Sequence, residues 1–150
     1  AVGERSAGAD LILMAAAVAD FRPATVATDK IKKDGGPPEI ILEPTVDILA
    51  GLGRSRVVGQ VLVGFAAETS DLRQNAAAKL VAKGIDLMVA NDVSAPGVGF
   101  DHETNAVVIL DADGGAMEVP LTDKREVARV VLDAALAVHT TNRSPNGDET

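Results

Sequence analysis

Three lysines lie within four residues of a chain that is otherwise acidic. Lys30, Lys32 and Lys33 form the run Lys-Ile-Lys-Lys, whereas the whole sequence carries a formal net charge of −8. If this strip is extended, Lys30 and Lys32 project to one side and Ile31 to the other. A lysine ammonium is a mobile point charge that suits phosphate, and a nucleoside triphosphate carries about four negative charges. The run indicates an anionic ligand, and lysines that protect a solvated edge strand from aggregation are the alternative.

A second pair of cations, Lys79 and Lys83, is four residues apart in a segment with helical spacing. The apolar stripe of this segment consists of Leu72, Ala76 and Leu80. Both lysines border that stripe, so they lie on one side of the expected helix and can reach along the surface toward a crevice. The ordinary alternative is a solvated helix whose lysines lay their stems on apolar surface and keep their charges in water.

Apolar runs alternate with helical patterns along the chain, which predicts an α/β fold. We expect a Rossmann-like three-layer fold with a mostly parallel central sheet and a C-terminal β-hairpin plus helix. The expected central strands cover residues 11–17, 61–66 and 85–90, and their continuous apolar character is typical of strands covered on both faces. The expected hairpin pairs residues 106–110 with 116–120 around a glycine-containing turn.

Helix boundaries follow from capping residues. We expect a short helix over residues 46–52, a second over 71–83 and a third over 122–139. Ser70 is the candidate N-cap of the second helix and Gly84 its C-terminal stop, while Thr122 is the candidate N-cap of the third. The polar segment 140–150 is expected to be a disordered tail, which leaves residues 1–139 as one domain.

Composition excludes several classes of function. The chain has 150 residues and no cysteine, so disulfides, thiolate zinc sites and thiol nucleophiles are excluded. Its longest apolar run, residues 11–19, is far shorter than the roughly 20 residues of a membrane span. The acidic balance argues against a nucleic-acid surface. We expect a cytoplasmic protein, because no export signal is visible.

Three segments rich in small residues lie at the carboxyl ends of the expected central strands. The sequences AAVAD, GFAAE and VANDVS begin at residues 16, 64 and 89. Ligands of open parallel sheets bind beyond the carboxyl ends of the strands, so the three segments are expected to converge on one crevice. Small residues there admit a ligand to the backbone, although close helix packing also requires them. Dinucleotide and P-loop fingerprints are absent, and His102 and His139 are too isolated to indicate a metal site.

The same segments carry a resemblance to a known family. Residues 14–33 read MAAAVADFRPATVATDKIKK, residues 63–69 read VGFAAET and residues 87–94 read LMVANDVS. Their order and spacing closely resemble those of phosphopantothenoylcysteine synthetase, the CTP-dependent ligase of coenzyme A biosynthesis that is often fused behind a flavin-dependent decarboxylase. The resemblance covers about residues 8–138. Nothing here corresponds to the family's upstream half-domain, so the chain is expected to begin inside the synthetase domain.

The resemblance implies roles for particular residues. The catalytic residues would be Lys30 and Lys32, with Lys33 in support, and Asn91 and Asp92 would shape the crevice. The family's Asn-Pro-Asp-Ile segment corresponds to residues 45–48, where Thr45 and Val46 depart from it. The residues that would contact CTP are Met14, Ala15, Ala16, Asp20, Lys30, Val46, Asp47, Ile48, Leu49, Phe65, Lys79 and Lys83.

The resemblance also implies substrates and partners. The substrates would be CTP, 4'-phosphopantothenate and cysteine, with Mg²⁺ as the metal and its ligands unknown. By analogy, the protein would be a homodimer in which a segment of the partner covers the site. Two alternatives remain at this point. One is a truncated CTP-binding module without catalysis, and the other is an interaction fragment without a ligand.

Overall fold

The chain folds into two compact units. The structure is a computed structural model and describes residues 1–31, 36, 39–95, 98 and 102–143. The larger unit comprises Ala1–Ala15 and Ile48–Thr150, and the smaller comprises Ala16–Asp47. No helix among the described residues is long and apolar enough to cross a membrane.

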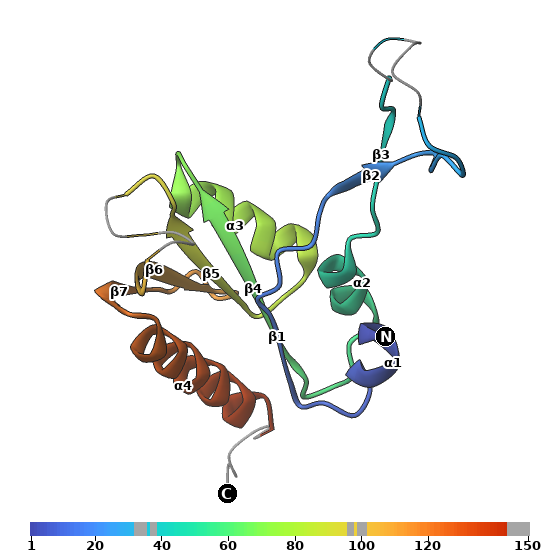
Figure 1. The fold of residues 1–150 in the computed structure, drawn as a ribbon. Coiled ribbons are helices and arrows are strands. Elements are labelled where there is room, and N and C mark those ends of the chain that lie inside the picture. The colour runs from blue at the N-terminus through green and yellow to red at the C-terminus, as the bar shows by residue number, and fades with distance from the viewer. Residues whose placement is uncertain (32–35, 37–38, 96–97, 99–101, 144–150) are drawn as a thin grey trace, which may run out of the picture. The chain divides into compact units, whose positions relative to one another are not determined.

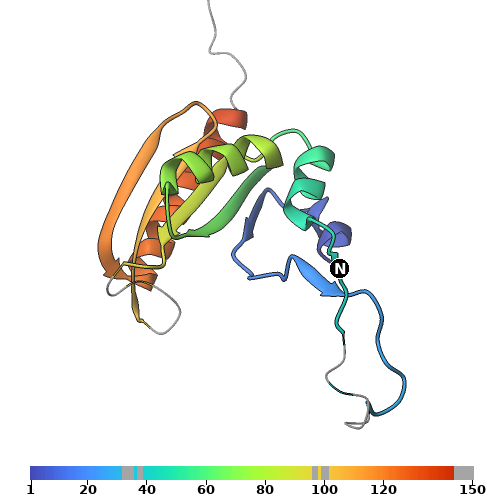
Figure 2. The same ribbon diagram turned by 90° about the horizontal axis from the view of Figure 1, so that it is seen from above.

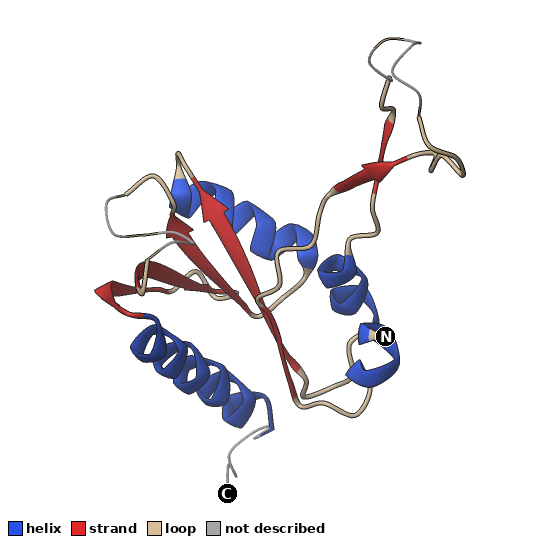
Figure 3. Ribbon diagram, in the orientation of Figure 1, coloured by secondary structure: helices blue, strands red, loops and turns tan. Residues whose placement is uncertain are grey.

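A five-stranded sheet in the order β1-β4-β5-β6-β7 organises the larger unit (Figures 1 and 3). The strands are β1 (Leu11–Met14), β4 (Val61–Glu68), β5 (Leu87–Asp92), β6 (Thr104–Asp111) and β7 (Ala116–Asp123). The strands β1, β4 and β5 pair in parallel, and β6 is antiparallel to both β5 and β7. All strands except β6 therefore point the same way. This confirms the mostly parallel sheet and the C-terminal hairpin, and it makes the three predicted central strands neighbours.

Helices cover both faces of this sheet. They are α2 (Ile48–Ser55) and α3 (Leu72–Lys83) on one face and α4 (Lys124–Arg143) on the other. The short helix α1 (Val2–Ser6) contacts α2 and has no buried residue. Figure 2 looks down onto α3, with the strands beneath this helix and α4 beneath the strands. The arrangement confirms the predicted three layers.

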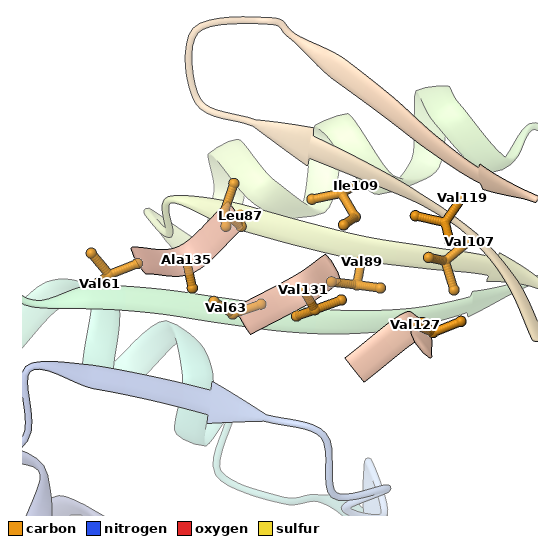
Figure 4. Packing of buried hydrophobic residues seen from close by; sticks show 10 residues of the cluster. All are labelled: Val61, Val63, Leu87, Val89, Val107, Ile109, Val119, Val127, Val131 and Ala135. Atoms are coloured by element: carbon orange, nitrogen blue, oxygen red, sulfur yellow. The ribbon is translucent and has the colours of Figure 1, made fainter. Parts of the chain in front are cut away.

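Successive side chains of the central strands pack alternately against the two helical layers. Leu62 packs in a buried cluster with Leu52 of α2 and Leu80 of α3. Its neighbours Val61 and Val63 belong to the opposite cluster. Figure 4 shows that second cluster, which also contains residues of α4: Val61, Val63, Leu87, Val89, Val107, Ile109, Val119, Val127, Val131 and Ala135. Because both faces are covered, the strands are apolar throughout, as expected.

Two of the three predicted helix caps are wrong. Asp71, with φ of 47°, occupies the N-cap of α3 in place of Ser70 and makes no side-chain cap bond. The carboxylate of Asp123 accepts N–H bonds from Arg125 and Glu126 at 3.0 and 2.9 Å, so it caps α4. Thr122 instead lies within β7. Gly84 is confirmed as the stop of α3, because it adopts the left-handed conformation and donates to the carbonyls of Leu80 and Val81.

Other boundaries also differ from expectation. Strand β1 ends at Met14, so residues 15–17 of the first expected strand lie outside it. The short helix α2 spans Ile48–Ser55, whereas it was expected over residues 46–52. The last helix continues to Arg143, so residues 140–143 of the expected tail are helical. Residues 144–150 lie outside the described residues.

The smaller unit is built around a two-stranded antiparallel ribbon. Its strands are β2 (Phe21–Pro23) and β3 (Leu42–Pro44). An ion pair of 2.7 Å joins Arg22 to Glu43 across the ribbon. Both side chains are largely exposed, so the pair contributes at most about 1 kcal/mol to stability. Backbone hydrogen bonds along the ribbon hold its two ends together.

Candidate functional site

The predicted site residues divide between the two units. Met14, Ala15, Ile48, Leu49, Phe65, Lys79 and Lys83 belong to the larger unit, whereas Ala16, Asp20, Lys30, Val46 and Asp47 belong to the smaller. Lys32 and Lys33 lie outside the described residues.

The carboxyl ends of β1, β4 and β5 lie side by side in the larger unit. Met14 of β1 pairs with Gly64 of β4, and β4 then continues to Glu68, which pairs with Asp92 of β5. The earlier end of β1 therefore leaves the last four residues of β4 without a partner on that side within the described sheet. This staggered edge is where open parallel sheets place their ligands.

A cavity of about 340 Å³ opens at this edge, on the face covered by α4. Its lining residues are Leu13, Ala15, Phe65, Asn105, Lys124, Val127, Ala128, Val131 and Leu132. Ala15 and Phe65 were predicted site residues, and the structure brings them together. Phe65 is 41% exposed although it follows four buried positions of β4. An exposed ring at the wall of an apolar cavity is suited to a flat ring of a ligand.

Sequence reasoning missed Asn105 and Lys124, the two polar residues of this cavity. Asn105 lies in β6, and its side-chain oxygen accepts the N–H of Ala106 at 3.0 Å. Lys124 is the first residue of α4. Neither residue belongs to a recognisable motif. Only the antiparallel return of β6 and the packing of α4 bring them to the ends of β1 and β4.

Lys79 lies on the other face of the sheet, where α3 packs. Its ammonium bonds to Oε1 of Glu68 at 2.6 Å. The side chain of Glu68 is only 10% exposed, whereas that of Lys79 is 47% exposed. Lys83 follows one turn later in α3 and is half-buried. The predicted apolar stripe of α3 is confirmed, because Ala76 and Leu80 are buried against the sheet and Leu72 packs beside them.

Asn91 and Asp92 end β5 and begin the turn that follows. The carboxylate of Asp92 accepts hydrogen bonds from the hydroxyl of Ser94 at 2.5 Å and from its backbone N–H at 2.9 Å. The hydroxyl bond is the main reason why the pKa of Asp92 lies below its ordinary value. Asp92 therefore shapes the backbone after the strand, and its predicted role in shaping a ligand crevice stays a prediction.

In the smaller unit, Asp20 lies beside the segment 45–47. Thr45 donates its backbone N–H to the carbonyl of Asp20 at 2.8 Å and its hydroxyl to the carbonyl of Ala19 at 2.6 Å. Thr45 is one of the two positions that depart from the family pattern. Its hydroxyl ties this position to Ala19, the neighbour of Asp20, so this departure is accommodated next to the end of β3. Val46 is 81% exposed there.

Lys30 is exposed and lies outside any strand. The adjacent Ile31 is 58% exposed, so it does not anchor the strip to a core among the described residues. The roles of Lys30 and of the other predicted contacts stay predictions. No group of three or more His, Cys, Asp or Glu side chains in the described part of the chain could hold a metal ion.

Comparisons with known proteins agree on one family. The family model described as DNA/pantothenate metabolism flavoprotein C-terminal domain matches residues 1–138. The coenzyme A biosynthesis bifunctional protein CoaBC of Bacillus subtilis is 47% identical over 137 residues, which cover 90% of this chain and 34% of that protein. The corresponding protein of Mycobacterium tuberculosis is 44% identical over 144 residues, with 89% and 34% covered. The chain thus spans about a third of the length of these relatives.

Solved structures of similar fold include a domain of the same kind of protein. The C-terminal domain of a CoaBC protein matches with a TM-score of 0.72 and 34% identity, covering 95% of this chain and 60% of that one. A Cab2 mutant in complex with phosphopantothenate-cysteine matches with a TM-score of 0.63 and 19% identity, covering 88% and 44%. The second likeness shows the fold alone.

Proposed function

Because the chain belongs to the family of DNA/pantothenate metabolism flavoprotein C-terminal domains, we propose that it forms the nucleotide-binding part of a CTP-dependent phosphopantothenate–cysteine ligase. Such a ligase joins 4'-phosphopantothenate to cysteine in coenzyme A biosynthesis. The residues that would contact the nucleotide are those predicted above from the family motifs.

One observation carries this proposal. The motif segment that follows β1 and the motif that forms the last residues of β4 meet at one edge of the sheet, where Ala15 and Phe65 line the same cavity. In the same sheet, β5 brings Asn91 beside Ala67. Convergence of these strand ends is the geometry that a ligand site in an open α/β sheet requires. A packing role for the small residues does not account for an exposed phenylalanine at the cavity wall.

The proposed reaction has two steps. The carboxylate of 4'-phosphopantothenate attacks the α-phosphate of CTP, which forms an acyl-cytidylate and releases pyrophosphate. The amine of cysteine then attacks the acyl carbon and displaces CMP. Because anionic partners must approach one another, lysines that stabilise negative charge on the α-phosphate and on pyrophosphate would lower the barrier. We assign this role first to Lys30, with Lys32 and Lys33 in support.

The described residues fit a nucleotide-borne Mg²⁺ better than a metal cage. They contain no cluster of three metal-ligating side chains. Mg²⁺ commonly enters such sites on substrate phosphates, with one or two carboxylates from the protein. Asp20 is the candidate carboxylate, either toward the metal or as an acceptor for the ribose hydroxyls.

We extend the proposal to a homodimer fused to or associated with a flavin-dependent decarboxylase. The smaller unit exposes many large apolar side chains: Val18, Phe21, Val26, Ile31, Ile40, Ile41, Leu42 and Val46. Apolar surface gathered on so short a segment is typical of an interface. Its occupant in this proposal is a second copy of the chain.

The second candidate is a module that binds CTP without catalysis, because the chain spans only about a third of its relatives. Calorimetric titration with CTP and Mg²⁺, with ATP as the comparison, tests both readings. CTP-selective binding accompanied by CMP release in the presence of both other substrates supports the ligase. Selective binding without CMP release supports the binding module. The absence of any nucleotide response would overturn both.

A further inference from the structure

Glu68 is the last residue of β4, and its carboxylate is used at both oxygens. Oε1 accepts from the Lys79 ammonium at 2.6 Å, and Oε2 accepts from the Asn75 amide at 3.3 Å. The same amide of Asn75 donates to the carbonyl of Ser70 at 3.0 Å. The backbone carbonyl of Glu68 accepts the N–H of Val93, which follows β5. The residue is thus held by its strand, by α3 and by the turn beyond β5.

We propose that Glu68 is a positioning residue that holds the Lys79 ammonium at the carboxyl edge of β4, ready for the triphosphate of the nucleotide. This inference rests on the proposed function and deepens it. Glu68 touches no substrate in this proposal and acts through Lys79.

The difference in burial makes Glu68 the fixed partner of the pair. The Glu68 side chain is 10% exposed and bound at two oxygens, whereas Lys79 is 47% exposed. A free lysine side chain carries about 2 kcal/mol of rotamer entropy, which a phosphate would have to overcome on binding. A fixed carboxylate removes part of that entropy before the ligand arrives, so less is lost when the phosphate binds.

The ion pair leaves Lys79 able to bind a phosphate. An ammonium has three N–H donors, and Glu68 takes one of them. The direction of the side chain also fits, because helical side chains lean toward the helix N-terminus. For α3, that terminus is the end that follows the carboxyl edge of β4. Lys79 therefore lies at the edge even though its backbone is two turns into the helix.

The test compares Glu68→Gln, Lys79→Ala and the double variant in calorimetric titrations with CTP and with CMP, both with Mg²⁺. The matched control is Glu118→Gln. Glu118 lies in β7 and pairs with Arg73, which is in α3 like Lys79. The side chain of Glu118, however, is 72% exposed. The unfolding midpoint of each variant reports any loss of stability separately from binding.

We expect Glu68→Gln to weaken CTP binding about three- to tenfold and CMP binding hardly at all. The reason is that CMP lacks the β- and γ-phosphates, which Lys79 would reach in CTP. In the Lys79→Ala background, Glu68→Gln should have no further effect on CTP affinity. Glu118→Gln should bind both nucleotides like the unaltered chain.

Two results would overturn the inference while leaving the proposed function in place. One is a loss of CTP affinity in Lys79→Ala with no loss, or a gain, in Glu68→Gln. The other is an equal loss from Glu68→Gln with and without Lys79, since a purely structural glutamate would behave that way. If neither the unaltered chain nor any variant responds to CTP, the proposed function itself fails.

Discussion

Phe65 and Glu68 leave β4 on opposite faces of the sheet. Phe65 lines the cavity beneath α4, whereas Glu68 reaches Lys79 on α3. Their separation by three residues explains this, because side chains alternate along a strand. A nucleotide that uses both would lie across the carboxyl edge, with its base on the α4 side and its phosphates on the α3 side.

Base and phosphate affinities should therefore be separable. Phe65→Ala should weaken CTP binding about tenfold, because stacking of a base on an aromatic ring contributes about 1–3 kcal/mol. The same variant should bind inorganic tripolyphosphate as the unaltered chain does. Lys79→Ala should weaken the binding of both CTP and tripolyphosphate. Calorimetric titrations with CTP and tripolyphosphate check this, and Phe65→Tyr is the control that keeps a ring. A loss of tripolyphosphate affinity in Phe65→Ala would contradict the crossing geometry.

Lys30 should affect the chemical step more than binding. Loss of one group that stabilises developing charge typically lowers kcat by about 10²–10³-fold. We expect Lys30→Ala to lower the rate of pyrophosphate release by that order while CTP affinity falls less. The assay contains CTP, Mg²⁺ and 4'-phosphopantothenate, and Lys30→Arg controls for charge alone. Equal falls in kcat and in CTP affinity would instead assign Lys30 to binding.

The fold could be predicted because its determinants are local. Continuous apolar runs such as residues 61–63 predict strands that are buried on both faces. In the structure, α4 packs against one face of these residues, and α2 and α3 pack against the other. Gly84 is the natural residue for a left-handed helix stop. The cap of α3 could not be predicted in this way, since Ser70 and Asp71 are both good capping residues and only the path of the chain out of β4 decides between them.

Of the residues that line the candidate cavity, the sequence predicted only those that lie in family motifs. Ala15 and Phe65 lie in family motifs and meet at one cavity. The Glu68–Lys79 bond joins the end of β4 to a residue of α3 that lies eleven positions later in the sequence. This bond depends on how α3 is rotated against the sheet. Asn105 and Lys124 reach the cavity only through the tertiary packing of β6 and α4. No local sequence pattern predicts how a helix is rotated against a sheet or how distant elements pack together.

Gly53 should be intolerant of any side chain. A Cβ at this position would lie 2.0 Å from the backbone oxygen of Lys83, and neither helix can move without disturbing the core. Gly53→Ala should therefore lower the free energy of unfolding by on the order of 3 kcal/mol. Gly51→Ala is the matched control in α2, because nothing lies within 4 Å of its Cβ position. The control should be neutral or stabilising by up to about 1 kcal/mol. Urea unfolding measures both, and equal stabilities would contradict the close approach of α2 to α3.

Ser94 should control the titration of Asp92. Its hydroxyl bond is the largest cause that holds the pKa of Asp92 below the ordinary 3.8. A carboxyl whose pKa is lower in the folded state stabilises the fold above the unfolded pKa, and the contribution is lost as pH falls through the folded pKa. Ser94→Ala should raise the pKa of Asp92 toward its ordinary value, as followed by carboxyl NMR. Ser55→Ala is the control, since that hydroxyl donates to the carbonyl of Gly51. An unchanged Asp92 pKa in Ser94→Ala would refute the assignment.

The smaller unit should carry the dimer contact. Ile41 is 66% exposed, and its backbone carbonyl accepts the N–H of Ala24, so replacing its side chain leaves that bond in place. Ile41→Lys should dissociate the dimer, because a buried interface disfavours an unpaired charge. Val58→Lys is the control: Val58 is fully exposed, yet it belongs to the larger unit. Sedimentation equilibrium should give twice the chain mass for the unaltered protein and for Val58→Lys, and a lower mass for Ile41→Lys. A monomeric unaltered protein, or a dimer that survives Ile41→Lys, would show that Ile41 is not part of a dimer contact.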